Sequence, residues 1–195
     1  MPRRSFSGSD GYNPIDLLQA SSDHLSSANV LFSIGDFFNH LGFLDVDLEA
    51  PRCLDSAGYL SHLGVELLLK ALLLHFSGSF PDEHSLRKLL SALKQNEIPL
   101  VLTQEQLETL KELDRLYELR YPNPQNMPSI GSMAWPRIHS LWSAIGERLP
   151  AELIVAVQTL DRTKKFGRVL MKKQKEGPPF EGHVVVIGQQ KGALK

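Results

Sequence analysis

Residues 60–76 read LSHLGVELLLKALLLHF, and this stretch decides the fold of the chain. It predicts a helix, because leucine and alanine recur every three or four residues, while other apolar residues cover most of the remaining sides. A helix that is apolar all round is buried on all sides. We therefore expect a central helix over about 55–76, in the middle of a bundle or in a dimer interface, ended by Gly78 and Pro81.

The sequence PDEHSLRKLLSAL at residues 81–93 follows and predicts a short amphipathic helix. Its leucines are three or four residues apart, so they share one helical face. We expect this third helix over about 82–95, with His84 near its start.

A fourth helix ends in the sequence LDRLYELRYPNP at residues 113–124. It opens with Thr103 and Gln106, which have the spacing of a capping box, in which each side chain accepts the backbone N–H of the other residue. Arg120 falls at its C-terminal end, where a cation interacts favourably with the helix dipole. Pro122 forbids any continuation.

The rest of the chain adds helices of the same period. A first helix is expected from Pro14 to about Phe32, ended by Gly35, because proline is favoured at the first helical position. Two more helices are expected over about 135–148 and 150–162. The predicted fold class is therefore all-α, a bundle of five to six helices with a basic C-terminal extension.

Three segments are expected along the 195 residues. Residues 1–12 are rich in Ser, Gly and charged residues, so we expect a flexible N-terminus. Residues 13–150 are expected to form the helical bundle. Residues 151–195 are expected to form an additional helix and the basic extension, which corresponds to one domain with an appendage.

The net charge of −1 hides an asymmetry between the bundle and the extension. Residues 1–161 hold 12 Lys and Arg against 20 Asp and Glu, whereas residues 162–195 hold 9 against 2. Such a run is by default a solvated tail, but it also suits contact with RNA or DNA, or docking on the acidic body of a neighbouring subunit. The cations expected to contact nucleic acid are Lys164, Lys165, Arg168, Lys172 and Lys173.

The composition favours a cytoplasmic protein without metal or cofactor. The single Cys53 excludes an intrachain disulfide and suits a reducing compartment. The sequence holds no Cys/His cluster, HExxH, P-loop or GxGxxG motif, so neither a metal nor a cofactor is predicted. The apolar stretch at 63–76 carries Glu66 and Lys70 and is shorter than the roughly 20 residues of a membrane helix, so no membrane segment is predicted.

Taken in order, these features resemble the HEPN family (higher eukaryotes and prokaryotes nucleotide-binding). The matching parts are the run Glu-Leu-Leu-Leu-Lys-Ala-Leu at 66–72, a short loop leading to His84 and a leucine-rich helix, and a helix ending in Leu-Arg-Tyr-Pro at 119–122. The resemblance covers about residues 14–150. It implies a four- to five-helix bundle that is usually dimeric, and the apolar surface of the central helix also favours a homodimer.

Many HEPN proteins are metal-independent ribonucleases, and their motif is an Arg followed, after four to six residues, by a His. Arg120 is followed at those positions by Gln125, Asn126 and Met127, and no other Arg of the chain satisfies the motif. The chain therefore resembles HEPN subgroups without the motif, which are implicated in nucleotide or partner binding and are found beside nucleotidyltransferases.

The resemblance thus predicts a non-catalytic dimeric module that binds a nucleotide, RNA or a protein partner such as a nucleotidyltransferase, within a toxin–antitoxin or defence system. The alternative is a diverged metal-independent ribonuclease in which Arg120 acts with a remote histidine, such as His84 or His139.

Glu66 and Lys70 are the first candidate site residues, because they are four residues apart on a helix that is otherwise apolar, with His62 one turn earlier. Buried charges need partners. The pair is expected either to form an internal salt bridge that holds the bundle, or to place Lys70 beside Arg120 in a phosphate cleft.

The other candidates are Arg120, Tyr121 and His84. Arg120 offers a planar fork for phosphate and Tyr121 a face for stacking. The alternative for Arg120 is a helix-capping role with a carboxylate partner. The alternative for His84 is a hydrogen bond that shapes the turn before the third helix.

Overall fold

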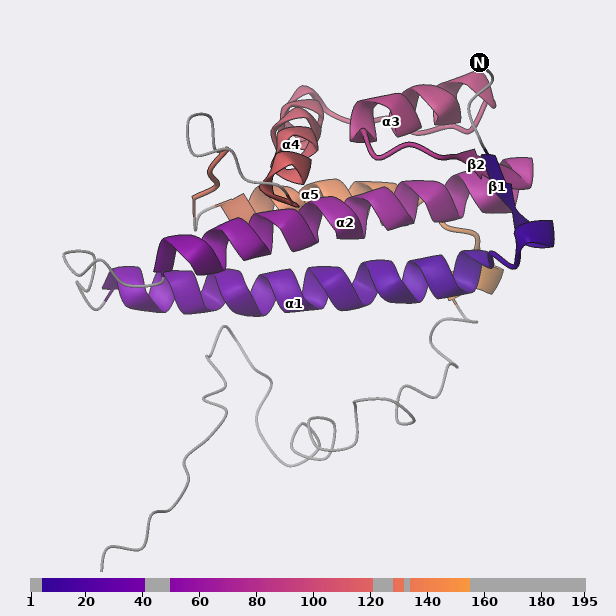
Figure 1. Ribbon diagram of the computed structural model, residues 1–195. Helices are drawn as coiled ribbons and strands as arrows, with labels where there is room; N and C mark the ends of the chain where they lie inside the picture. Colours follow the sequence, from indigo (N-terminus) through magenta and orange to yellow (C-terminus); the bar gives the residue numbers. More distant parts are fainter. Residues whose placement is uncertain (1–4, 41–49, 121–127, 132–133, 155–195) are drawn as a thin grey trace, which may run out of the picture. The chain divides into compact units, whose positions relative to one another are not determined.

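The structure, a computed structural model, describes residues 5–40, 50–120, 128–131 and 134–154. Within them the chain forms a helical bundle with one small sheet, so the predicted all-α fold class is confirmed (Figure 1). Tyr121, most of the predicted sixth helix and the basic extension lie outside the described residues. The predicted segment boundaries and the role of the extension stay predictions.

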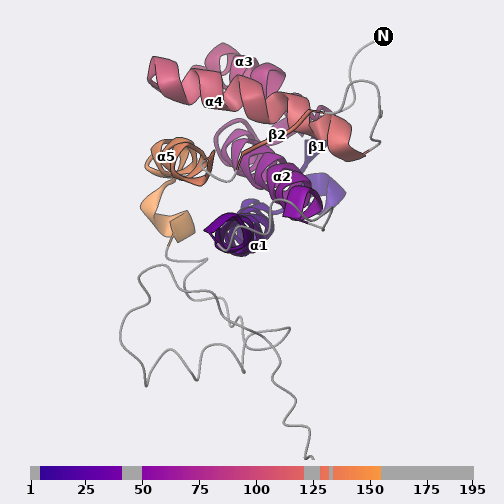
Figure 2. The ribbon, with the colours of Figure 1, turned by 90° about the vertical axis from the view of Figure 1, so that its left-hand side faces the viewer.

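Two long helices, α1 (Pro14–His40) and α2 (Ala50–Ser77), run side by side (Figures 1 and 2). They approach closely at Gly64, whose carbonyl accepts a hydrogen bond from Ser21 Oγ at 2.6 Å. A Cβ atom at position 64 would lie 2.5 Å from Leu25 Cγ, so the approach requires glycine.

The central helix of the bundle is α2. Figure 2 shows it between α1, α5 (Trp135–Gly146) and a layer formed by α3 (Leu86–Gln95) and α4 (Gln104–Arg115). Most of its apolar side chains are buried within the chain, as predicted, whereas Phe76 near its end is 50% exposed. The most deeply buried are Val65, Leu68, Leu69, Ala71, Leu72 and Leu73.

Within α2, Cys53–Ser77 is long and apolar enough to cross a membrane by length and composition alone. The apolar stretch predicted at residues 63–76 is therefore too short, because the apolar helix already begins at Cys53. However, 78% of the apolar window is buried inside the chain. Packing against the other helices accounts for its composition.

The two long helices exceed their predicted lengths. α1 continues through Gly35 and ends at His40. A glycine inside a helix costs only about 1 kcal/mol relative to alanine, and the long contact with α2 outweighs this. α2 begins at Ala50 and has Pro51 in its first turn, where the missing N–H has no helical partner to lose.

The third helix starts later than predicted, at Leu86, so His84 lies in the connection before it. The side chain of Ser85 makes no capping hydrogen bond to this helix. Instead, the carboxylate of Asp114, from α4, accepts the Leu86 N–H at 2.6 Å. A residue 28 positions away thereby supplies the cap.

The fourth helix begins with the predicted capping box. Thr103 Oγ1 accepts the Gln106 N–H at 3.2 Å, and Gln106 Oε1 accepts the Thr103 N–H at 2.9 Å. After α4 the chain continues as a 3₁₀-helix, η3 (Leu116–Arg120), where the sequence predicts one unbroken helix. The tighter winding of η3 decides where its side chains lie.

A small antiparallel sheet joins the N-terminal residues to the end of α2. Strand β1 (Ser5–Ser7) pairs with β2 (Ser79–Pro81), and Phe6 lies opposite Phe80. Tyr12 follows the 3₁₀-turn η1 (Gly8–Asp10), with its ring centroid 5.2 Å from that of Phe80. Aromatic contacts of Phe6 and Tyr12 with Phe80 thus connect the N-terminal segment to β2.

Candidate functional site

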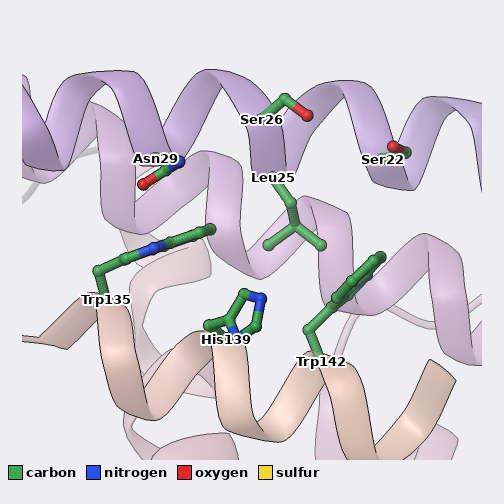
Figure 3. A pocket seen from close by; sticks show the side chains of 7 residues that line it. All are labelled: Ser22, Leu25, Ser26, Asn29, Trp135, His139 and Trp142. Atoms are coloured by element: carbon green, nitrogen blue, oxygen red, sulfur yellow. The ribbon is translucent and has the colours of Figure 1, made fainter. Parts of the chain in front are cut away.

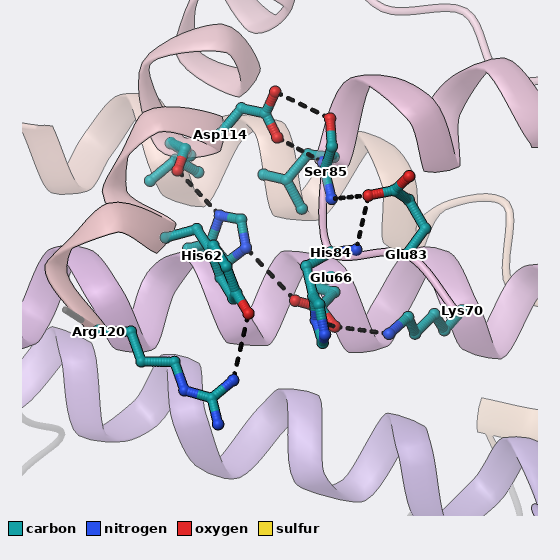
Figure 4. Close-up of polar contacts among 11 residues, drawn as sticks. His62, Glu66, Lys70, Glu83, His84, Ser85, Asp114 and Arg120 are labelled. Carbon is teal, nitrogen blue, oxygen red and sulfur yellow. Dashed lines mark hydrogen bonds and ion pairs between the residues drawn. The ribbon is translucent and has the colours of Figure 1, made fainter. Parts of the chain in front are cut away.

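Glu66 lies in the middle of α2 and is only 3% exposed. Three basic side chains surround its carboxylate (Figure 4). Lys70 Nζ donates to Oε1 at 2.6 Å, and His84 Nδ1 lies 3.0 Å from the same oxygen. His62 Nε2 lies 3.3 Å from Oε2. The predicted ion pair of Glu66 and Lys70 is present, and it belongs to a larger group that we call the Glu66 cluster (His62, Glu66, Lys70 and His84).

His62 links this cluster to α4. Its Nδ1 lies 2.9 Å from the Leu113 carbonyl oxygen, and because a carbonyl only accepts, Nδ1 carries the hydrogen. The other ring nitrogen faces Glu66 Oε2 without the alignment of a hydrogen bond, so both buried atoms lack a hydrogen-bond partner among the described residues. The contact is therefore electrostatic, and it is attractive when the ring is protonated.

The surroundings of Glu66 keep its carboxylate ionised. Burial acts to raise the pKa of Glu66, but the contacts with His62 and Lys70 and the positive charges of Lys70 and His84 outweigh it, so the pKa is lowered from 4.5. A carboxylate that is both buried and charged is stable only with such partners. Lys70, whose side chain is 8% exposed, is held by the same bond.

Two carboxylates fix the connection that carries His84. Glu83 Oε1 accepts the backbone N–H groups of His84 and Ser85, both at 3.1 Å. Asp114 Oδ2 accepts from Ser85 Oγ at 3.1 Å, while its other oxygen caps Leu86. These hydrogen bonds fix the backbone around His84 between α3 and α4. They thereby hold its imidazole in contact with Glu66.

Tyr117, on η3, connects the cluster to Arg120. Its ring stacks on the His84 imidazole, with centroids 4.9 Å apart and 13° between the planes. The His62 ring lies on another side, 5.4 Å away. Arg120 Nη1 donates to the Tyr117 hydroxyl at 3.2 Å. Residues 36 positions apart in the sequence, His84 and Arg120, are therefore joined through one tyrosine (Figure 4).

The exposed part of this site consists of the His84 imidazole and the Arg120 guanidinium. Because Glu66 is ionised and only accepts, the His84 Nδ1 carries the hydrogen between them, which leaves Nε2 as the ring nitrogen that is not bonded to Glu66. The side chain of His84 is 43% exposed, and Arg120 is exposed beside it. The site thus offers a fixed imidazole, an aromatic ring and a guanidinium at one surface.

Four of the five predicted site residues come together here: Glu66, Lys70, His84 and Arg120. Tyr121 lies outside the described residues. His139, the other histidine considered with Arg120, instead makes ring contacts with the two tryptophans of α5.

The sequence reasoning missed Tyr117 and Asp114 and underrated His62. His62, Glu66 and Lys70 follow one another at four-residue spacings, and this pattern could have placed His62 beside Glu66. The three-residue spacing of Tyr117 and Arg120 was a signal for their contact. The Asp114 cap had no local signal. Within the described ranges, no group of three or more His, Cys, Asp or Glu residues is placed to hold a metal ion.

Comparison with known families agrees with the helical fold. The family model of the HEPN domain matches residues 47–160, more than half of the chain. The chain belongs to the HEPN family. No curated protein and no solved structure matches it. Membership in the HEPN family connects the protein with nucleotide- or RNA-related functions and with toxin-like roles.

Proposed function

We propose that this HEPN protein is a non-catalytic module that binds a nucleotide or an RNA strand at the surface formed by His84, Tyr117 and Arg120. The observation that carries the proposal is the contact chain from the buried Glu66 carboxylate through the His84 ring to Tyr117 and Arg120. The buried part fixes the exposed part, and preorganised groups bind with a smaller loss of entropy.

Each exposed group suits one part of a nucleotide. The Arg120 guanidinium is a permanent cation whose fork matches a phosphate. The imidazole of His84, held by its stack on Tyr117 and 43% exposed, presents aromatic surface on which a base can stack. Lys70 is bound to Glu66 and largely buried, so it supports His84 through that carboxylate rather than contacting phosphate itself.

A gel-shift titration with labelled single-stranded RNA in EDTA tests this proposal. Arg120→Ala should weaken binding about tenfold or more, because one charge-assisted hydrogen bond contributes about 1.5–3 kcal/mol. Arg115→Ala is the matched control, since Arg115 is an exposed cation at the end of α4. Equal losses in both variants would reduce the effect to overall charge, and unchanged binding in Arg120→Ala would move the site elsewhere.

One observation favours the alternative, a diverged metal-independent ribonuclease. The Glu66–His84 contact at 3.0 Å has the form of a carboxylate–histidine dyad, which orients an imidazole for proton transfer. In that function His84 Nε2 takes the proton of the ribose 2′ hydroxyl, whose oxygen bonds to phosphorus as the bond to the 5′ oxygen of the next nucleotide breaks. The protonated imidazole then returns the proton to that 5′ oxygen, and Arg120 stabilises the phosphate charge. Cleavage of the same RNA in EDTA, lost in His84→Ala and kept in His75→Ala, would replace the binding proposal.

We also propose that the protein is a homodimer, on the basis of its family. The argument from the apolar surface of α2 no longer supports this, because the chain itself covers that helix. Light scattering at micromolar concentration decides the oligomeric state.

A nucleotidyltransferase partner in a toxin–antitoxin pair is the corresponding cellular proposal. Growth arrest on expression, relieved by Arg120→Ala or by the partner, would support it. Indifferent growth of cells that express the wild-type chain would contradict the toxin role.

A further inference from the structure

A groove between α1 and α5 lies outside the Glu66 cluster and encloses about 150 Å³ (Figure 3). Trp135, His139 and Trp142 line it from α5, at helical spacings of four and three residues, and therefore share one face. Ser22, Ser26 and Asn29 line it from α1, and the Leu25 side chain points between the two indoles.

The aromatic wall is continuous. The His139 ring centroid lies 6.0 Å from that of Trp135 and 6.3 Å from that of Trp142. Trp135 is further packed against the buried Phe32, at 5.9 Å, which holds its indole in place. His139 is exposed, and both tryptophans are half-buried, so the wall is accessible to a ligand.

The groove also offers hydrogen bonds that the protein does not use. The side chains of Ser22, Ser26 and Asn29 make no hydrogen bond to another described residue, whereas the neighbouring Ser27 bonds back to the Asp23 carbonyl. The hydroxyls of the two serines and the amide of Asn29 are therefore available to bond with a ligand in the groove.

The lining defines the chemical class of the ligand. No Lys, Arg, Asp or Glu side chain lines the groove, which disfavours a phosphate or a carboxylate. Its volume is about that of a cavity that takes a single benzene-like ring, and well below that of a pocket for a drug-sized molecule. A purely apolar ring would leave the amide of Asn29 and the serine hydroxyls without partners.

We propose that the α1–α5 groove binds one planar heteroaromatic ring with a hydrogen-bonding edge, as in a nucleobase, supplied by a free nucleoside or by single-stranded RNA. The ring stacks on the aromatic wall formed by α5, and its edge faces Asn29 and the serines of α1. This site is separate from the surface of His84, Tyr117 and Arg120, and the inference does not depend on the function proposed there.

Tryptophan fluorescence reports on this groove directly, because the chain has two tryptophans and both line it. We expect adenosine to quench the emission in a saturable way and ribose 5-phosphate, which has no base, to leave it unchanged. Ser26→Phe fills the groove and should weaken adenosine binding about tenfold or more, since stacking contributes roughly 1–3 kcal/mol per base. Ser27→Phe, one residue further along the exposed part of α1, is the matched control and should bind normally.

A second variant keeps the test decisive if Ser26→Phe does not fold, which circular dichroism would reveal. His139→Ala removes an exposed ring of the wall and should weaken adenosine binding roughly fivefold to tenfold. Arg120→Ala should leave adenosine binding unchanged, which separates this groove from the proposed phosphate site.

The source of the ring is decided by comparing adenosine with a short oligoadenylate. Quenching by adenosine supports a free nucleoside, and quenching by the oligonucleotide alone supports an RNA base. An equal response to ribose 5-phosphate, unchanged affinity in His139→Ala, or no response to either adenosine or oligoadenylate at millimolar concentration would overturn the proposal.

Discussion

The Glu66 cluster and the α1–α5 groove both contain histidine and lie beside aromatic rings, but they differ in charge and in hydrogen bonding. In the cluster, three basic groups surround one buried carboxylate: Lys70 and His84 by hydrogen bonds and His62 by an electrostatic contact. In the groove, the side chains of Ser22, Ser26 and Asn29 are neutral and make no hydrogen bond to another described residue. This difference indicates that the cluster stabilises a buried charge and the fold, whereas the groove keeps hydrogen-bonding groups available for a neutral ligand.

The largest effect should come from removing the carboxylate at the centre of the cluster. Glu66→Ala leaves a buried lysine without its partner, so the free energy of unfolding should fall by about 3–5 kcal/mol in urea titrations. Glu112→Ala, which breaks an exposed pair with Arg137, is the control and should cost less than about 1 kcal/mol. Similar small losses in both variants would mean that the cluster contributes no more than a surface ion pair.

A smaller loss is expected from the remote cap of α3. Asp114→Ala leaves the Leu86 N–H without its acceptor and should lower the free energy of unfolding by about 1–2 kcal/mol. It should also weaken RNA binding, because it frees the connection that carries His84. Asp23→Ala, at an exposed position of α1, should change stability by no more than about 0.5 kcal/mol. Equal stabilities of the two variants would contradict the capping role.

The charge of Glu66 should make the stability of the fold depend on pH. Because the pKa of Glu66 is lower in the folded chain, the unfolded chain binds the proton more readily. The stabilisation from this carboxylate is therefore fully present above about pH 4.5 and is lost as the pH falls through the lower folded value. Wild type should lose stability in this acid range more steeply than Glu66→Gln. Parallel curves would show that Glu66 is not ionised in the fold.

The smallest effect should follow from Tyr117→Phe, which keeps the stacked ring and removes the hydroxyl that Arg120 contacts. Stability should change by no more than about 0.5 kcal/mol. RNA binding should weaken roughly twofold to fivefold, as expected for one neutral hydrogen bond. Adenosine quenching in the groove should stay the same. A loss of adenosine binding in this variant would mean that the two regions are coupled.

The parts of the site that the sequence predicted are those set by local geometry. Glu66 and Lys70 lie four residues apart on one helix, so their contact follows from the helical repeat. The Thr103–Gln106 capping box is local in the same way, and its two hydrogen bonds are confirmed. Helix ends were less predictable: α1 passes through Gly35, because packing outweighs a modest local cost.

The parts that the sequence did not predict depend on residues far apart in the chain. The Asp114 cap of α3 requires α3 and α4 to cross at one position, and no pattern within either helix encodes this crossing. The stack of Tyr117 on His84 requires the 3₁₀-winding of η3 in addition.

The sequence alone determined that the protein is all-α, that the leucine-rich helix is buried, and that Glu66 and Lys70 share one face of it. These features follow from a repeat of 3.6 residues and from the need to bury apolar surface. Only the tertiary structure decided that His84, Tyr117 and Arg120 share one surface, and that two tryptophans of α5 meet the serines of α1. Those contacts join different helices, and the packing of whole helices sets their distances.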